Sequence, residues 1–407
     1  MLKNLKIFTF DNFIKTVIVF AIMFLFEKAF NISVFEPLRL TLDDVEITDN
    51  AFSSIIERST ISADTNITLI NSENISNRDL AALIAIIEQC APKGIGIEKI
   101  INKDFSDPIG DIELTQIINH NKNIIINKIL TNFNREHNYF NGYIVSDSDI
   151  VGATSTGHGN FYFDENKQFI TLRTCLPIVH SKDNIDTAFS VKLAMLLNPE
   201  AAKKLLSRKL SRETINWKGT DKFLTENYKN IIAGDFDKNI FSNKLVLLGI
   251  SKKVDAEAPS DEYALKDLYF TPLQKNSGVS WPDMYGLQVH ANIISMIIEG
   301  NYFNQMPRWL FYLLPILVCY CNMVLFGFIC DKFRDWYELS SIFIFVLESI
   351  LLLFIMYYCF LIYLFELKVT GAIFACALSL MIFEAYTFSI KPIIFHGLKK
   401  INKGEKL

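Results

Sequence analysis

Three long apolar stretches dominate the last hundred residues of the sequence. They cover residues 309–330, 341–365 and 369–390, and each has at least 22 residues. About 20 helical residues are enough to cross the hydrocarbon core of a membrane. The pattern therefore predicts three transmembrane helices, with residues 331–340 as a polar loop between the first two.

A shorter apolar stretch lies near the N-terminus. Residues 16–26 are apolar and follow three lysines, which is also how a cleaved secretory signal begins. However, Glu27 and Lys28 stand where a cleavage site needs small residues, and apolar residues then resume. We therefore expect an uncleaved transmembrane helix over residues 13–35, which makes four such helices. A cleaved signal is the alternative.

The placement of lysine and arginine in the short segments predicts the orientation in the membrane. Basic residues occur in segments 1–12 and 331–340, and five lysines occur in the tail 391–407. Such residues accumulate on the cytoplasmic side. We therefore expect a multi-pass membrane protein with both termini in the cytoplasm, and with residues 36–308 outside it.

Residues 36–308 alternate short apolar strands with amphipathic helices. A strand, helix, strand order with such strands predicts parallel pairing through a right-handed crossover. Between the early and late units the chain is rich in short strands with polar turns, which predicts an antiparallel insertion. We therefore predict an α/β domain with a mostly parallel central sheet. The expected strands are 66–70, 94–97, 123–127, 143–145, 160–163, 169–173 and 245–250, and the main helices are 76–90, 111–120, 186–197 and 287–298.

Composition narrows the function further. A formal net charge of −4 excludes the strongly basic surface of a nucleic-acid-binding protein. The six histidines are scattered singly, and no nucleophile elbow, phosphate-binding loop or paired-histidine motif occurs. We therefore expect no enzyme activity, no metal site and no cofactor.

Several short motifs follow one another in an order that is typical of a known family. The most specific are Lys-Leu-Val-Leu-Leu-Gly at 244–249, Thr-Pro at 271–272 and Val-His-Ala-Asn at 289–292, directly before the three predicted membrane helices. With these, residues 38–308 resemble the type 2 CHASE domain, an extracytoplasmic sensory domain of bacterial receptors. Further matches are Arg78, 94–98, 159–161, Arg173, 176–177 and 217–219.

The sequence also departs from the pattern of this family. Glu98 stands where the family usually has aspartate, and the turn at 164–167 lacks the usual glycine. These departures leave the predicted scaffold intact but put a ligand role of the acidic side chains in question.

The resemblance implies a sensory function in the inner membrane of a bacterium. Relatives usually continue past the third helix into a cytoplasmic output domain, whereas the 17 residues of the tail are too few for a catalytic core. We therefore expect the signal to pass to a separate partner protein, and the receptor relatives suggest a homodimer. The alternative is a non-catalytic structural or docking subunit of a membrane complex.

The expected ligand site lies beyond the carboxyl ends of the parallel strands, where open sheets bind ligands. Glu98 and Gly249 end two of these strands, and the connection after Gly249 carries Asp267 and Thr271. A purely structural interpretation is also open. In it, Gly249 permits a tight exit from the strand, Thr271 and Pro272 fix the returning loop, and His290 and Asn292 join that loop to the helix by hydrogen bonds. The candidate residues are Arg78, Glu98, Arg173, Gly249, Asp267, Thr271, His290 and Asn292.

Three polar residues within the predicted membrane helices form a second candidate site. Asn322, Glu348 and Glu384 are expected at one depth, about 9 to 12 Å from the cytoplasmic boundary at 1.5 Å per residue. Ionisable residues at such depth are costly and normally face protein. We expect Glu348 and Glu384 to meet across the bundle or to bind a polar group of a partner. Alternatively, each faces a different way.

Overall fold

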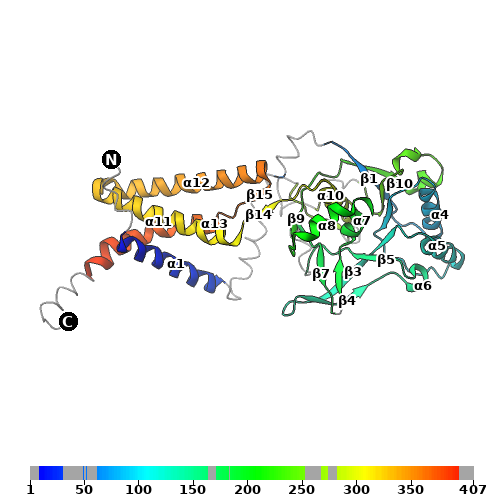
Figure 1. The fold of residues 1–407 in the computed structure, drawn as a ribbon, viewed down its shortest axis with the longest axis horizontal. Coiled ribbons are helices and arrows are strands. Elements are labelled where there is room, and N and C mark those ends of the chain that lie inside the picture. The colour runs from blue at the N-terminus through cyan, green and yellow to red at the C-terminus, as the bar shows by residue number, and fades with distance from the viewer. Residues whose placement is uncertain are drawn as a thin grey trace. The chain divides into compact units, whose positions relative to one another are not determined.

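The computed structural model describes residues 9–30, 49, 52, 62–163, 171–182, 184–252, 267–273 and 282–393. The chain forms two units, of which one comprises residues 44–303 and the other residues 1–43 together with 304–407 (Figure 1). The last residues of the predicted first membrane helix, the whole predicted turn at 164–167 and most of the basic tail lie outside the described residues.

A seven-stranded sheet forms the centre of unit 44–303. Its order is β10-β1-β11-β2-β3-β4, and β5 also pairs with β3. Every pair of neighbours is parallel except β3 and β4, which are antiparallel. The predicted α/β fold with a mostly parallel sheet is therefore confirmed. The strands are β1 Asp64–Asn71, β2 Gly94–Ile97, β3 Ile124–Asn134, β4 Tyr139–Ile144, β5 Ser155–His158, β10 Phe223–Asn227 and β11 Leu245–Gly249.

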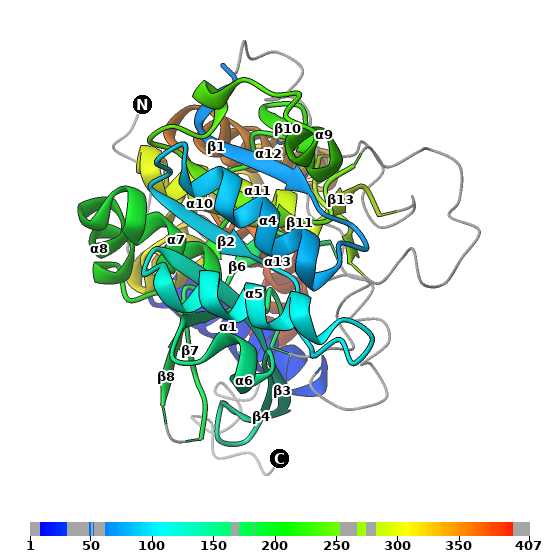
Figure 2. The same cartoon turned by 90° about the vertical axis from the view of Figure 1, so that its right-hand side faces the viewer.

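Helices cover both faces of this sheet. α4 and α5 share one apolar core with the sheet residues Ile70, Ile95 and Val246, and Figure 2 shows both helices in front of the sheet. α7 and α10 pack on the opposite face. The helices are α4 Asn77–Glu88, α5 Pro108–His120, α6 Ser148–Val151, α7 Phe189–Leu197, α8 Pro199–Ser207, α9 Tyr228–Ile232 and α10 Gly286–Glu299, with a 3₁₀ turn η4 at Lys238–Ile240.

Capping residues explain where the first two helices begin. The side chain of Ser76 accepts a hydrogen bond from the Asp79 N–H, which starts α4 as its sequence predicts. α5 begins three residues before the predicted position, because Asp107 caps it and Pro108 occupies its first turn.

The antiparallel part differs from the prediction at residues 160–163, which form no strand. The Asn160 side chain accepts a hydrogen bond from the Leu130 N–H and donates one to the Leu130 carbonyl, both at 2.8 Å. One amide group thus takes the place of a strand partner beside β3. The remaining short strands are β6 Thr174–Cys175, β7 Ile178–His180, β8 Ile185–Thr187, β9 Glu213–Thr214, β12 Leu268–Tyr269 and β13 Met284–Tyr285.

The second unit consists mainly of helices. Three helical segments are long and apolar enough to cross a membrane, at Arg308–Lys332, Arg334–Tyr363 and Thr370–Ile393. They correspond to the three predicted C-terminal spans. The elements are α1 Phe10–Phe30, α11 Arg308–Lys332, η6 Arg334–Trp336, α12 Tyr337–Tyr363, α13 Thr370–Glu384 and a π-helical turn η7 at Ala385–Ile390, with the short strands β14 Asn304–Gln305 and β15 Phe365–Glu366.

α1 is a helix of 21 residues but is not among these three segments. Asp11, Lys15, Glu27 and Lys28 lower its apolar character, so a fourth span remains a prediction. α1 nevertheless packs within the unit, since Val19 is fully buried in one cluster with Cys319 and Met323 of α11.

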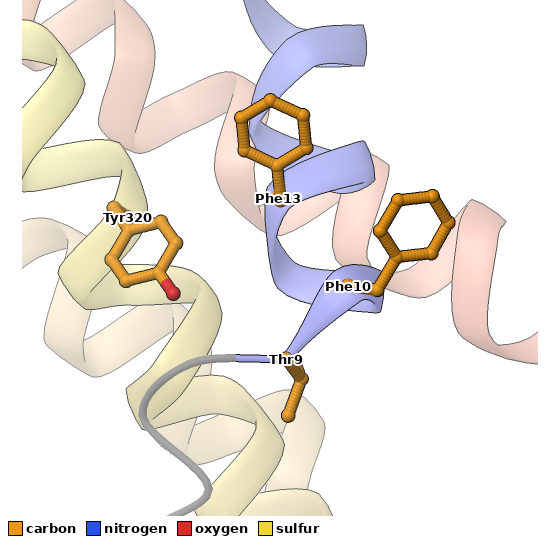
Figure 3. A pocket seen from close by; sticks show the side chains of 4 residues that line it. All are labelled: Thr9, Phe10, Phe13 and Tyr320. Carbon is orange, nitrogen blue, oxygen red and sulfur yellow. The ribbon is translucent and has the colours of Figure 1, made fainter.

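The N-terminal end of α1 lies beside the C-terminal end of α13. Asp11 forms an ion pair with Lys391, and the Lys15 ammonium lies 4.0 Å from the centre of the Phe383 ring. α1 and α11 also border a shallow hollow, which is lined by Thr9, Phe10, Phe13 and Tyr320 (Figure 3). Both chain ends of the described bundle therefore lie at the same end of it.

Candidate functional site

The candidate site lies at the carboxyl edge of the parallel sheet. Asn71 of β1 is in register with Gly249 of β11, and Leu248 is in register with Ile97 of β2. The backbone N–H of Glu98 donates to the Leu248 carbonyl at 2.9 Å, so the Glu98 side chain emerges directly beyond these strands. The N-terminus of α10 and the β12–β13 pair complete this edge.

Two glycines allow Glu98 and Asp267 to approach each other closely. An added Cβ on Gly286 would lie 2.5 Å from Asp267 Oδ1 and 2.8 Å from Glu98 Oε1, and a Cβ on Gly249 would overlap Glu98 Oε2. Both carboxyl groups therefore contact the first residue of α10. Three predicted site residues, Glu98, Gly249 and Asp267, are thus brought together. Gly286, which sequence reasoning did not single out, is the fourth member.

Burial raises the pKa of both carboxyl groups. The pKa of Glu98 lies well above its ordinary value because the group is desolvated and because Asp267 repels its charge. Burial raises the pKa of Asp267 to about 7, and the backbone N–H of Gly286 only partly opposes this effect. The acidic pair therefore favours the protonated form.

His290 on α10 faces this pair and forms no hydrogen bond with any residue that the structure describes. Its side chain is 3% exposed, and Nε2 lies 3.9 Å from Glu98 Oε1, while Nδ1 has no partner among the described residues. The rings of Phe161 and Phe189 pack against it, with centroids 4.6 and 5.0 Å away. Burial, with a smaller contribution from His158, lowers the pKa of His290 to about 3, so the imidazole is neutral.

Thr271 closes the short antiparallel pair β12–β13. Its backbone N–H and its hydroxyl donate to the two carboxylate oxygens of Asp283, at 2.7 and 2.5 Å. Burial raises the pKa of Asp283 to about 6, although these hydrogen bonds oppose the shift. Thr271 therefore has a structural contact, and Asp283 is a partner that sequence reasoning missed.

Replacing Thr271 with valine is expected to weaken the β12–β13 pair by about 1–2 kcal/mol, because Asp283 then loses a hydroxyl donor in a buried place. Hydrogen exchange of the amides in 267–273 measures the effect in the full chain. Thr225→Val, at an exposed position of β10, is the matched control. Unchanged protection of 267–273 would contradict the structural role of Thr271.

Asn292 connects α10 to the loop at 217–219. Its Oδ1 accepts from the backbone N–H groups of Lys218 and Gly219, at 2.7 and 3.2 Å, and its Nδ2 donates to the Gln288 carbonyl at 2.8 Å. The side chain is completely buried. Its partner is thus the Trp-Lys-Gly loop and not the Thr-Pro loop of our structural alternative.

Arg78 and Arg173 each bind one aspartate. Arg78 Nε and Nη2 donate to Asp107 at 2.8 and 2.5 Å, and this contact lowers the pKa of Asp107 to about 2. Arg173 donates to Asp49 in the same two-pronged way. Within the described part of the chain, neither arginine has a hydrogen bond to the acidic pair. Their contacts connect segments of the scaffold.

The candidate residues within the membrane helices are only partly brought together. Asn322 Nδ2 donates to Glu348 Oε2 at 2.8 Å, which joins α11 to α12. Among the described residues, no hydrogen bond or ion pair joins Glu384 to either of them. The described region also contains no group of three or more histidine, cysteine or acidic side chains that could hold a metal ion.

The structure defines the class of an α/β domain with a mostly parallel sheet, joined in one chain to helices that could cross a membrane. The CHASE2 domain matches residues 19–330, which is more than half of the chain. The chain therefore belongs to the CHASE2 family, a family of extracytoplasmic sensory domains. No curated protein and no solved structure matches the chain.

Proposed function

We propose that the chain is a receptor-like protein of a bacterial inner membrane. Its CHASE2 domain detects a ligand or a state of the envelope on the outer side and passes this signal to a separate partner protein. The observation that carries the proposal is the CHASE2 match, which covers the α/β unit and reaches the first of the three membrane-compatible helices. A family of sensory domains outside the cytoplasm supports detection and not catalysis.

The proposed topology has four membrane spans and both termini in the cytoplasm. The contact between Asp11 and Lys391 supports it, because an even number of spans returns the chain to the side where it began. The burial of Val19 among residues of α11 supports α1 as the first span. Lysines near both termini agree with this orientation.

Reporter fusions test this topology in living cells. A reporter fused after residue 407 is expected to be active only when it is of the kind that works in the cytoplasm. One inserted at residue 183 is expected to be active only when it is of the kind that works outside. The reverse result would overturn the orientation. Mass measurement of the purified chain tests α1, since a cleaved signal would remove it.

Purification of the intact chain from its native membrane tests the proposed signalling partner. Recovery of a kinase, cyclase or transcription regulator would support a receptor. Recovery of other envelope proteins in fixed stoichiometry would instead support the alternative of a structural or docking subunit. Crosslinking in the same membranes tests the proposed homodimer.

A further inference from the structure

Glu98 and Asp267 carry two largely buried carboxyl groups, and in the described part of the chain no cation lies beside them. Among the described residues, no lysine or arginine nitrogen lies within 4 Å of either carboxyl group. The nearby Lys252 forms its ion pair with Glu73, at 2.9 Å. Two like charges in a desolvated place repel each other, so one of them is normally neutralised by a proton or by a bound cation.

His290 gives a second, independent indication that this place is built to bind something positive. It is almost completely buried, it faces Glu98 Oε1 at 3.9 Å, and it forms no hydrogen bond among the described residues. A buried polar group without a partner is costly and needs an explanation. The imidazole that faces the pair is neutral, because burial lowers its pKa to about 3, so it leaves the charge of the pair to be neutralised by something else.

We propose that Glu98 and Asp267 form a proton-binding site through which the domain detects the pH outside the cytoplasm. The inference rests on the proposed sensory function and names its stimulus. The proton binds to a carboxylate oxygen of the pair, and on release it goes to solvent water. No oxidant, reductant or further reactant takes part.

The position of the pair connects its charge to the fold. Glu98 follows β2, Asp267 precedes β12, and both contact Gly286 at the start of α10. The backbone N–H of Gly286 also donates to the carbonyl of Asp267 at 3.0 Å. When both carboxyl groups are charged, their repulsion acts directly on the contact between the sheet edge, the β12–β13 pair and α10.

Most of the other titratable groups around the pair keep one charge state near neutral pH. His290 on α10 and His158 on β5 have pKa values lowered to about 3 by burial, so both are neutral above pH 4. Tyr269 on β12 has a pKa raised well above its ordinary value, and Tyr162 faces it. Tyr285 on β13, which Lys252 and Glu73 face, also has a raised pKa. Near neutral pH, the carboxyl pair therefore titrates together with Asp283, which directly precedes β13 and whose pKa burial raises to about 6.

The direction of the linkage follows from the raised pKa of Asp267. The folded domain binds this proton more tightly than the unfolded chain does, so the contribution to stability is complete below pH 4. It is lost as the pH rises towards about 7, where the folded group ionises. A rise in external pH thus loosens this edge of the sheet.

Infrared spectroscopy of the full chain in lipid nanodiscs tests the proposal, because a protonated carboxyl group has its own C=O stretching band. Between pH 5 and 10, the wild type is expected to lose this band in two steps that belong to the pair, besides one step from Asp283 that the variant Asp283→Asn removes. Glu98→Gln and Asp267→Asn should each leave one step, about one pH unit or more below the upper step of the wild type. Glu200→Gln, in an exposed pair with Lys203, is the matched control and should behave as the wild type.

Two results would overturn the proposal. The first is a wild type without a carboxyl band at pH 6, or with a titration that neither variant changes. The second is loss of that band at pH 6 on addition of millimolar Mg²⁺ or Ca²⁺, which would make the pair a metal site. Hydrogen exchange of α10 checks that both variants are folded.

Partner recovery at pH 6 and pH 8 separates this inference from the proposed function. A partner recovered equally at both pH values, together with a normal infrared titration, would overturn pH detection but leave the receptor proposal standing. If no partner is recovered at either pH, the receptor proposal fails while the proton-binding site is judged by the infrared result alone.

Discussion

Replacing Asn292 with alanine is expected to destabilise the α/β domain by about 2–4 kcal/mol. The Asn292 side chain is fully buried and accepts hydrogen bonds from two backbone N–H groups in the loop at 217–219. Alanine leaves both donors without a partner in a place that water does not reach. Hydrogen exchange in α10 and in residues 214–220 of the full chain measures the loss.

Asn230→Ala is the matched control, because Asn230 is exposed on the short helix α9. It is expected to change stability by less than about 0.5 kcal/mol. Asn292→Asp keeps the accepting oxygen and should retain part of the stability that alanine loses. If Asn292→Ala were as stable as the wild type, the side chain would be available for ligand binding and its structural role would be refuted.

The order of strands and helices could be predicted because it depends on local patterns. The apolar run at 245–249 is short and ends in glycine, which indicates a buried strand, and the apolar spacing of 287–298 indicates a helix. The strand predicted at 160–163 failed because one side chain, Asn160, replaces the ladder that a strand would form. Periodicity does not detect such a replacement.

The sequence also indicated which edge of the sheet matters, but not which side chains meet there. Glu98 and Gly249 could be assigned because both end parallel strands. Asp267 lies 18 residues after Gly249 in a connection without periodicity, so its contact with Glu98 could not be predicted. The same holds for Asn292, whose partner Lys218 is 74 residues away in sequence.

Replacing Lys218 with methionine is expected to cost more, about 3–5 kcal/mol. The Lys218 ammonium lies 3.3 Å from Asp64 Oδ2 and also contacts Glu299. The side chains of Lys218 and Asp64 are only 11% and 3% exposed. Methionine fills a similar volume but leaves the Asp64 carboxylate without its cation. Among the described residues, it then keeps hydrogen bonds from the Ser295 hydroxyl and the Asn66 N–H.

The double variant Lys218→Met/Asp64→Asn separates the two causes of this loss. If the cost comes from an uncompensated buried charge, removing that charge should restore most of the stability; if it comes from lost packing, the double variant should be no better than the single one. Lys203→Met is the control, because the side chains of Lys203 and its partner Glu200 are 70% and 81% exposed and their ion pair is worth at most about 0.5 kcal/mol.

Lys218 and Asn292 belong to two different motifs of the CHASE2 resemblance, yet they hold the same loop against α10. Loss of signalling in either variant would therefore report loss of the scaffold, whereas Glu98→Gln and Asp267→Asn are expected to change the response of a domain that is still folded.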